Sequence, residues 1–257
     1  MPKKPIYRYL RYLWRNRIGF CNICRKPTAF LHTQSRDTLR DDLECLFCRS
    51  ISRNRHLAKC VVNLFAAKGV NTLRDLDTQS GLNIYIAAAS GSIVKALGDF
   101  DNVTTSEYHE GYESGSTRDG VLCQNIENLS FDDDLFDLVI TEDVFEHVQN
   151  YSKGFEEVQR TLKNEGVFIF TVPFYFDRKT QDLFRSIDGE FVPVVTPVEY
   201  HGDSIRGKIP AFYRFGWDVF DLLAETGFET EVIFSKFRDT KWLRIYDCYT
   251  FIARKKT

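Results

Sequence analysis

Buried strands and amphipathic helices alternate along most of this chain, and this alternation limits the possible folds more than any other feature. From about residue 80, the sequence predicts strands near residues 83–87, 102–106, 136–141, 167–172, 229–235 and 247–253. The spacing of apolar residues predicts helices near residues 93–97, 152–163 and 217–226. Strands that alternate with helices form a mostly parallel sheet covered by helices, so we expect an α/β fold.

Candidate binding residues follow the predicted strands, because ligands of such folds bind at the carboxyl ends of the strands, near the point where strand order reverses. The sequence places four groups of residues there. They are Ala87, Ala88, Ala89 and Gly91 after the first strand, Glu107 and Tyr108 after the second, Asn125 and Ile126 in the next connection, and Thr141 and Glu142 after the third.

Four cysteines near the amino terminus form the strongest local motif. Cys21 and Cys24 make one C-x₂-C pair, and Cys45 and Cys48 make a second pair 20 residues later, a spacing typical of a zinc ribbon. Four thiolates complete a tetrahedral shell and leave no position for a substrate, so we expect a structural zinc ion. The odd total of seven cysteines argues against a disulfide framework.

Charge is distributed unevenly along the chain. Residues 1–60 contain 14 Lys or Arg and 4 Asp or Glu, whereas residues 61–257 contain 20 Lys or Arg and 32 Asp or Glu. Aromatic residues and arginines also interleave between residues 7 and 17. This basic segment could stack on nucleic-acid bases, lie on an anionic membrane surface, or pack against the zinc module.

The longest apolar run is too short to cross a membrane as a helix. The run VFIFTVPFYF begins at Val167 and has about half of the roughly 20 residues that a spanning helix needs. The amino terminus also lacks the uninterrupted apolar segment of a signal peptide. We therefore expect a cytoplasmic protein with no transmembrane segment.

Residues 127–174 carry a recognisable pattern, ENLSFDDDLFDLVITEDVFEHVQNYSKGFEEVQRTLKNEGVFIFTVPF. This stretch resembles the segment of class I S-adenosylmethionine-dependent methyltransferases that reads Leu-Pro-Phe, Phe-Asp-Leu-Val, Glu-His-Val and Leu-Lys-Pro-Gly-Gly. The zinc ribbon, together with the later motifs TVPF, EYHGD and FGWD, is similar to bacterial methyltransferases that carry an amino-terminal zinc ribbon. Some of those proteins occur among cell-surface glycan genes.

The resemblance implies a domain organisation. It predicts a basic segment and zinc ribbon over residues 1–55, a linking helix over residues 56–79, and a Rossmann-like methyltransferase domain over residues 80–257. Within that domain, residues 175–216 are long enough to form a lid over the acceptor. The implied cofactor is S-adenosylmethionine, with zinc in a structural role.

The resemblance also assigns roles at the cofactor site. Glu107 stands where a carboxylate accepts hydrogen bonds from both ribose hydroxyls, and Asn125 stands where a side chain contacts the adenine amino group. In IYIAAASG, residues 84–91, Tyr85 replaces an acidic residue, and Ala87 and Ala89 replace glycines. Because alanine disfavours positive φ, the loop is expected to bind more weakly or to follow a different path.

Candidate catalytic residues lie in PVEYHGDS, residues 197–204. In an extended segment Glu199, His201 and Asp203 point to the same side. His201 could then act as a general base oriented by Asp203, or the three could hold a divalent cation near a sugar acceptor. A loop hydrogen-bond network would explain the same residues. His147, in FEHV, is expected to support the site rather than to catalyse the reaction.

Three functions are compatible with these features. The leading hypothesis is O- or N-methylation of a small molecule or glycan. The first alternative is an RNA methyltransferase that holds its substrate with the basic zinc module, and the second is a noncatalytic cofactor-binding scaffold. The sequence leaves the oligomeric state open.

Overall fold

The computed structural model describes residues 17–32, 38–77, 80–187, 190–203 and 206–256. The chain forms two compact units, each assembled from several stretches of sequence. The first unit comprises residues within 1–81, 90–103 and 232–250, and the second comprises 82–89, 104–231 and 251–257. Within the described ranges, no helix combines the length and the apolar character needed to cross a lipid bilayer.

The first unit contains a small antiparallel sheet that carries the four cysteines. Its strands are β1 (Ile18–Cys21), β2 (Lys26–Leu31) and β3 (Glu44–Cys45), in the order β1-β2-β3. Ile18 pairs with Ala29, and Phe30 pairs with Cys45. The turn between β1 and β2 carries Cys24, the turn that follows Cys45 carries Cys48, and the four cysteine sulfur atoms lie close together.

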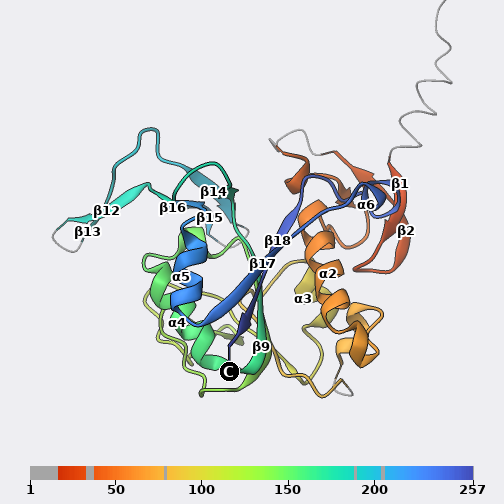
Figure 1. The fold of residues 1–257 in the computed structure, drawn as a ribbon, viewed down its shortest axis with the longest axis horizontal. Coiled ribbons are helices and arrows are strands. Elements are labelled where there is room, and N and C mark those ends of the chain that lie inside the picture. The colour runs from red at the N-terminus through yellow and green to blue at the C-terminus, as the bar shows by residue number, and fades with distance from the viewer. Residues whose placement is uncertain (1–16, 33–37, 78–79, 188–189, 204–205, 257) are drawn as a thin grey trace, which may run out of the picture. The chain divides into compact units, whose positions relative to one another are not determined.

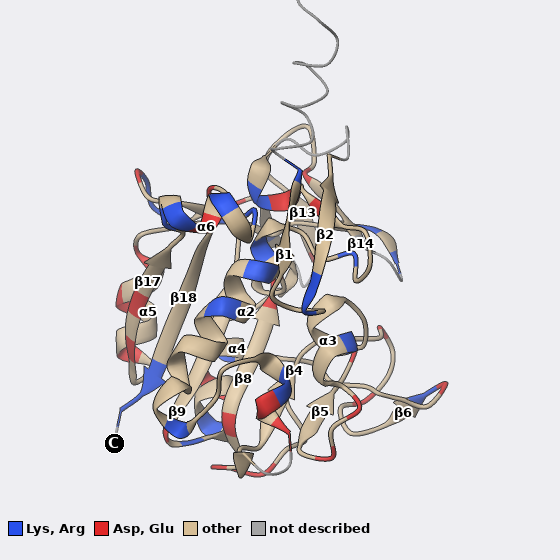
Figure 2. Cartoon of the chain, turned by 90° about the vertical axis from the view of Figure 1, so that its right-hand side faces the viewer, with Lys and Arg blue, Asp and Glu red and all other residues tan. Residues whose placement is uncertain are grey.

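Helices complete the first unit (Figure 1). The longest is α2 (Ser52–Leu64), which buries Leu57, Ala58 and Val61 on one side, as the helical spacing of its apolar residues predicts. The basic residues of α2 appear as blue segments in Figure 2. The remaining helical elements are α3 (Ser92–Leu97), α6 (Phe237–Trp242) and the 3-10 turns η1 (Leu39–Asp41), η2 (Ala66–Lys68) and η3 (Leu73–Leu76).

A six-stranded sheet organises the second unit. Its order is β17-β18-β9-β8-β4-β5, formed by β4 (Ile84–Ile86), β5 (Val103–Thr105), β8 (Phe136–Glu142), β9 (Leu162–Thr171), β17 (Phe228–Phe234) and β18 (Tyr249–Lys255). Strand β8 runs parallel to β4 and to β9, while β18 runs antiparallel to β9. The predicted α/β fold is confirmed, and strand order reverses between β4 and β8. Ligands of such sheets bind outside the strands at this point.

Aromatic side chains form much of the core of the second unit. Helices α4 (Tyr151–Thr161) and α5 (Val219–Glu225) lie on the same side of the sheet (Figure 1). Phe155 of α4 stacks on Phe145 with ring centroids 4.4 Å apart, and Phe168 stacks on Phe170 at 4.5 Å. Burying one such side chain contributes about 1.5–3 kcal/mol, so this cluster holds the strand ends in place.

Residues 174–216 form hairpins rather than an irregular loop. Strands β12 (Phe184–Ile187) and β13 (Glu190–Pro193) make one hairpin, and β14 (Tyr200–Asp203) and β15 (Gly207–Pro210) make another. Strand β16 (Tyr213–Gly216) pairs with β10 (Phe174–Tyr175) and with β11 (Gln181–Asp182). The shorter elements are β6 (Thr117–Arg118), β7 (Val121–Leu122) and the 3-10 turn η5 (Phe145–His147), which follows β8.

Candidate active site and metal centre

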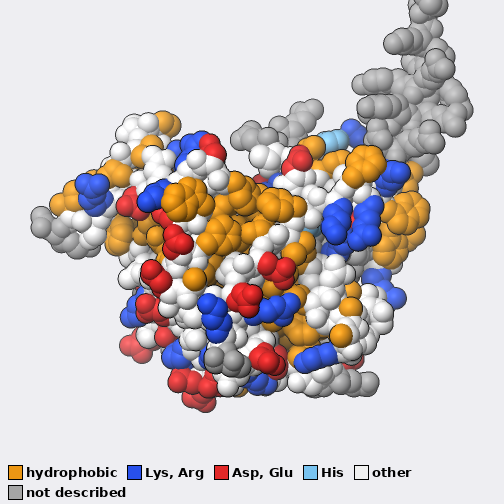
Figure 3. Space-filling model, in the orientation of Figure 1, with side chains coloured by type: hydrophobic (Ala, Val, Ile, Leu, Met, Phe, Trp, Pro, Cys, Tyr) orange, Lys and Arg blue, Asp and Glu red, His pale blue; other side chains and the backbone are white. Residues whose placement is uncertain are grey.

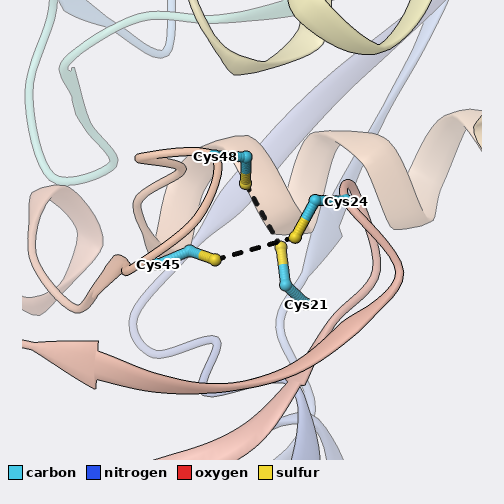
Figure 4. A group of neighbouring side chains, drawn as sticks. All are labelled: Cys21, Cys24, Cys45 and Cys48. Carbon is cyan, nitrogen blue, oxygen red and sulfur yellow. Dashed lines mark hydrogen bonds between the residues drawn. The ribbon is translucent and has the colours of Figure 1, made fainter.

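The four predicted zinc ligands lie together in the first unit (Figure 4). The sulfur atoms of Cys21 and Cys48 are 3.5 Å apart, and those of Cys24 and Cys45 are 3.8 Å apart. All four sulfur atoms lie within 4.8 Å of one another. Zinc–sulfur bonds of about 2.3 Å place tetrahedral sulfur atoms about 3.8 Å apart, so the cluster fits a zinc ion.

The two cysteine pairs have the same backbone conformation. In each pair the residue after the second cysteine is an arginine with positive φ, 59° at Arg25 and 64° at Arg49. The backbone N–H of that arginine donates to the carbonyl of the first cysteine, at 2.8 Å to Cys21 and 3.0 Å to Cys45. The left-handed residue closes a tight turn that points both thiols of a pair in one direction.

A buried arginine contacts Ser50, whose hydroxyl lies 3.3 Å from the sulfur of Cys21 and 3.2 Å from that of Cys48. The Arg55 guanidinium is fully buried and donates to the backbone carbonyls of Ser50, Leu243 and Arg244. It also lies 4.2 Å from the centroid of the Phe30 ring. Burial lowers the pKa of Arg55 to about 10, so the side chain keeps its charge at neutral pH. This positive charge opposes the net negative charge that four thiolates give a zinc ion.

In the loop after β4, the alanines have negative φ angles and Gly91 has a positive φ. Ala87, Ala88 and Ala89 are all described, and none of them has a positive φ. Gly91 has φ +113°, and a Cβ added to it would meet no atom beyond its chain neighbours within 4 Å. The alanines are therefore unstrained, and the left-handed conformation falls on the glycine that the sequence retains.

Tyr85 is a core residue and does not line the strand end. Its ring is buried and stacks on Phe136 with centroids 5.4 Å apart. Its hydroxyl lies 2.7 Å from the hydroxyl of Ser106. Tyr85 therefore fills part of the hydrophobic core. The resemblance places an acidic residue at this position, and here the side chain packs in the core instead.

Glu107 lies at the end of the adjacent strand with its carboxylate 12% exposed. Oε1 accepts from the backbone N–H of Tyr108 at 3.2 Å, and Oε2 lies 3.5 Å from the backbone nitrogen of Ala89. Oε1 also accepts from Nη2 of Arg206 at 2.8 Å. Tyr108 itself is exposed beside this carboxylate. Glu107 therefore links two strand ends and offers an acceptor pair close to the point where strand order reverses.

The other predicted cofactor-binding residues have varied surroundings. The Oδ1 atom of Asn125 accepts from the backbone N–H of Glu127 at 3.0 Å, which makes a local Asx turn. Ile126 and Thr141 are buried, and the Thr141 hydroxyl has no hydrogen-bond partner among the described residues. Glu142 is half-buried at the end of β8. Their roles in cofactor binding stay predictions.

The segment EYHGD is extended, as expected, and brings two of its three predicted side chains together. Nε2 of His201 lies 3.2 Å from Oε1 of Glu199. The backbone of Asp203 pairs with Gly207 at the end of β14, but its side chain lies outside the described residues. The basic aromatic segment over residues 7–17, apart from Arg17, is likewise outside the described ranges.

His201 also contacts two residues, His147 and Glu146, whose proximity the sequence does not predict. Nδ1 of His201 is 3.2 Å from Nε2 of His147 and 3.6 Å from Oε1 of Glu146. Nε2 of His147 is 3.8 Å from the same carboxylate oxygen. The neighbouring Glu146 carboxylate raises the pKa of His201, whereas burial lowers the pKa of His147. We call Glu146, His147 and His201 the histidine cluster.

Three residues of this region were missed by sequence reasoning. Glu146 precedes the selected His147 but is fully buried, which is unusual for a glutamate and is not visible in the sequence. Arg206 and Arg214 bind Glu107 and Glu199, each across a long sequence separation. Only the Glu-His pair itself could have pointed to Glu146.

Comparisons with known proteins match part of the chain to a protein family. Residues 84–170 match a family model described as a methyltransferase domain. A 51-residue stretch is 49% identical to an uncharacterized protein of Methanocaldococcus jannaschii, and this match covers 20% of the present chain and 22% of that protein. The chain thus aligns with about a fifth of the length of that curated relative.

Two solved structures illustrate the structural likeness. One is a S-adenosylmethionine-dependent methyltransferase from Clostridium acetobutylicum, with 15% identity, a TM-score of 0.46, and coverage of 78% of the present chain and 91% of its own. The other is a S-adenosylmethionine dependent methyltransferase from Mesorhizobium loti, with 14% identity, a TM-score of 0.41, and coverage of 68% and 91%.

Proposed function

We propose, from the match of residues 84–170 to a methyltransferase-domain model, that the chain transfers a methyl group from S-adenosylmethionine to a hydroxyl of a small polar acceptor such as a sugar. The observation that carries the proposal is the placement of Glu107 and the histidine cluster in one unit, where Glu107 follows β5, and Glu146 and His147 follow β8 of the same sheet. Glu107 offers acceptors for ribose hydroxyls. The histidine cluster offers groups that can handle the proton of an acceptor hydroxyl.

The chemistry asks for alignment and for removal of one proton. The acceptor oxygen loses its proton and forms a bond to the methyl carbon, while the carbon–sulfur bond breaks and its electron pair stays on sulfur. The sulfonium already activates the methyl group, so the protein mainly positions the oxygen in line with it. His201 is the residue proposed to assist proton removal, supported by the carboxylates of Glu146 and Glu199 beside its ring.

The hairpin segment is proposed to form the acceptor side. Strands β14 and β15 place His201 against the turn η5 that follows β8. The same segment exposes apolar side chains, and hydrophobic patches are visible over it in Figure 3. They include Phe176, Ile187, Val192, Val194, Tyr200 and Trp217. Apolar and aromatic surface beside a few polar groups suits a sugar or another small ring-bearing molecule.

The cysteine cluster is proposed to hold a structural zinc ion. Four sulfur ligands fill the tetrahedral shell, so the ion would stabilise the small sheet of the first unit without entering the reaction. The nearby Arg55 would then balance part of the negative charge of the four thiolates. The zinc module therefore supports the fold in this proposal.

Incubation with S-adenosylmethionine labelled at the methyl group tests the acceptor class. We expect label in a mixed pool of sugars and glycan fragments, and no label above background in RNA. His201→Ala should lower turnover by about 100-fold, the usual scale for loss of a group that removes a proton. His109→Ala is the matched control, since His109 lies in the same unit and contacts Arg118 instead of the histidine cluster. Transfer of the label to RNA and not to sugars would contradict a sugar acceptor and would identify RNA as the acceptor class.

A further inference from the structure

Three hydrogen-bond acceptors converge in the histidine cluster. The Glu146 carboxylate is fully buried, and neither of its oxygens accepts a hydrogen bond from any described residue. Its nearest polar neighbours are the imidazole nitrogens of His201 at 3.6 Å and His147 at 3.8 Å. Burying a carboxylate without partners costs several kcal/mol, so the protein maintains an arrangement that is unfavourable when nothing is bound there.

Hydrogen bonds on the outer side of each imidazole determine what faces the carboxylate. Nδ1 of His147 lies 2.7 Å from the carbonyl oxygen of Pro210, which can only accept, so Nδ1 carries the proton. Nε2 of His201 lies 3.2 Å from Oε1 of Glu199, so that nitrogen donates as well. In the neutral rings, Nε2 of His147 and Nδ1 of His201 therefore direct lone pairs toward the cluster centre.

With both rings neutral, the lone pairs cannot satisfy one another, and either a proton on Nδ1 of His201 or a bound cation is needed between them. The two inward nitrogens are only 3.2 Å apart, yet neither carries a proton in the neutral rings, and the adjacent carboxylate oxygen is also an acceptor. Arg214 holds Glu199 with both Nε and Nη2 at 2.8 Å from Oε2, so Glu199 is already paired and lies outside the converging set. A single positive ion at the centre would satisfy all three groups.

We infer that Glu146, His147 and His201 bind one divalent transition-metal ion. Their ligand atoms lie within 4.8 Å of one another, with separations of 3.2, 3.6 and 3.8 Å. Ligands about 2.1 Å from one ion are about 3.0–3.5 Å apart in octahedral or tetrahedral geometry, so small side-chain movements bring the set into range. Two imidazoles and one carboxylate favour Mn²⁺, Fe²⁺, Co²⁺ or Zn²⁺ over Mg²⁺ or Ca²⁺.

Outer contacts support each ligand in the way metal sites require. The Pro210 carbonyl orients His147, and the Glu199 carboxylate, itself held by Arg214, orients His201. Such contacts fix the ring and its tautomer, and they raise the basicity of the inward nitrogen. Glu146 and His147 come from η5, and His201 comes from β14. The two histidines are 54 residues apart in the sequence. The ion would therefore also fasten the hairpin to the sheet.

A role in the reaction follows if the proposed methyl transfer is correct. Three protein ligands leave positions open on the ion, which an acceptor hydroxyl can occupy. The ion would lower the pKa of that hydroxyl, whose proton is then lost to solvent before the oxygen attacks the methyl carbon. His201 would act as a ligand in this case, and the acceptor would be one with an oxygen able to bind a metal, such as a sugar hydroxyl.

Titration with Mn²⁺ tests the site without requiring any activity. Mn²⁺ is a hard ion that suits a mixed nitrogen and oxygen site better than a four-thiolate site, so the cysteine cluster does not compete strongly. We expect loss of the free Mn²⁺ paramagnetic resonance signal with saturation at one ion per chain. His147→Ala, His201→Ala and Glu146→Gln should each abolish saturable binding. Glu199→Gln should weaken it by about 10–100-fold, the usual effect of losing an orienting group.

Controls separate ligand loss from misfolding. His109→Ala removes a histidine of the same unit outside the cluster and should bind Mn²⁺ as the natural chain does. Glu146→Gln should leave the melting temperature of the metal-free protein unchanged or raised, because it removes a buried charge while keeping the volume. Equal Mn²⁺ binding by the natural chain and Glu146→Gln, or no saturable binding by the natural chain, would overturn the inference.

The metal site and the proposed function can fail separately. Mn²⁺ binding is measured without cofactor or acceptor, whereas cofactor binding is measured by titration with S-adenosylmethionine. Saturable Mn²⁺ binding in a chain that binds no cofactor would support the metal site and contradict the methyl transfer. Methyl transfer that persists in Glu146→Gln at the natural rate would contradict the role of the ion.

Discussion

The guanidinium of Arg206 donates to the carboxylate of Glu107, with Nη2 2.8 Å from Oε1. Glu107 lies at a strand end of the sheet, while Arg206 belongs to the connection between β14 and β15. The pair thus joins the predicted cofactor side of the second unit to its predicted acceptor side. Because Glu107 is also expected to accept from ribose hydroxyls, Arg206 competes for the same oxygen in the structure described here.

Removing that competition should strengthen cofactor binding. A partly exposed ion pair contributes at most about 1 kcal/mol, so Arg206→Ala should lower the dissociation constant for S-adenosylmethionine by up to about fivefold. Calorimetric titration measures this change. Arg118→Ala is a matched control, since Arg118 contacts His109 and Asp119 in the same unit. Weaker binding by Arg206→Ala would mean that the guanidinium contacts the cofactor directly.

Stoichiometric zinc should accompany the natively purified chain. Elemental analysis is expected to find at least one zinc ion per chain, and Cys24→Ser should lose one zinc ion relative to the natural chain, because the four sulfur atoms form one closed cluster. Removal of the ion with a chelator should lower the melting temperature, since binding energy at such sites is folding energy. Cys123→Ser is a control, because that cysteine lies in the other unit. Protein that folds with full stability and no zinc would contradict the assignment.

The left-handed conformation of Arg25 predicts that glycine is tolerated better than alanine at this position. Its φ of 59° brings Cβ close to the following carbonyl, which costs about 1–2 kcal/mol in a residue other than glycine. Arg25→Gly should therefore exceed Arg25→Ala in free energy of unfolding by roughly 1 kcal/mol. Both variants lose the guanidinium, so their difference isolates the backbone effect. Chemical denaturation measures it, and equal stabilities would show that the turn carries no such strain.

Acid sensitivity should come partly from His56. Burial lowers the pKa of His56 to about 4, while an unfolded histidine has a pKa of about 6.5. Below about pH 6.5, His56 binds a proton in the unfolded chain but stays neutral in the folded chain. The free energy of unfolding therefore falls as the pH drops toward 4. His56→Gln should reduce this fall. Parallel pH profiles of unfolding for the natural chain and His56→Gln would refute the prediction.

Much of the fold could be predicted from sequence because local patterns determine it. The alternation of strands and helices predicts the sheet, and the helical stripe of Phe155 and Val158 predicts the buried face of α4. The cysteine spacing predicts the cluster, since each pair is closed by a local turn. The extended segment at His201 and its contact with Glu199 also follow from a period of two along the strand.

The rest depends on tertiary contacts that no local pattern reports. The meeting of His147 and His201 requires the hairpin β14–β15 to pack against η5, and that packing brings the fully buried Glu146 into the same cluster. Tyr85 illustrates a different limit, because its position suggests a ligand contact while its ring fills the core. The left-handed φ of Arg25 was equally hidden, since arginine rarely adopts it.

Calorimetric titration with S-adenosylmethionine measures cofactor binding to the chain. We expect saturable binding of one cofactor per chain, weakened at least about tenfold in Glu107→Ala, because a charged acceptor of two hydroxyls is lost. Asn125→Ala should weaken binding less, since the carbonyl oxygen of Asn125 is engaged in an Asx turn with the backbone of Glu127. An absence of saturable binding to the natural chain, or equal affinity of the natural chain and Glu107→Ala, would contradict a cofactor site at Glu107.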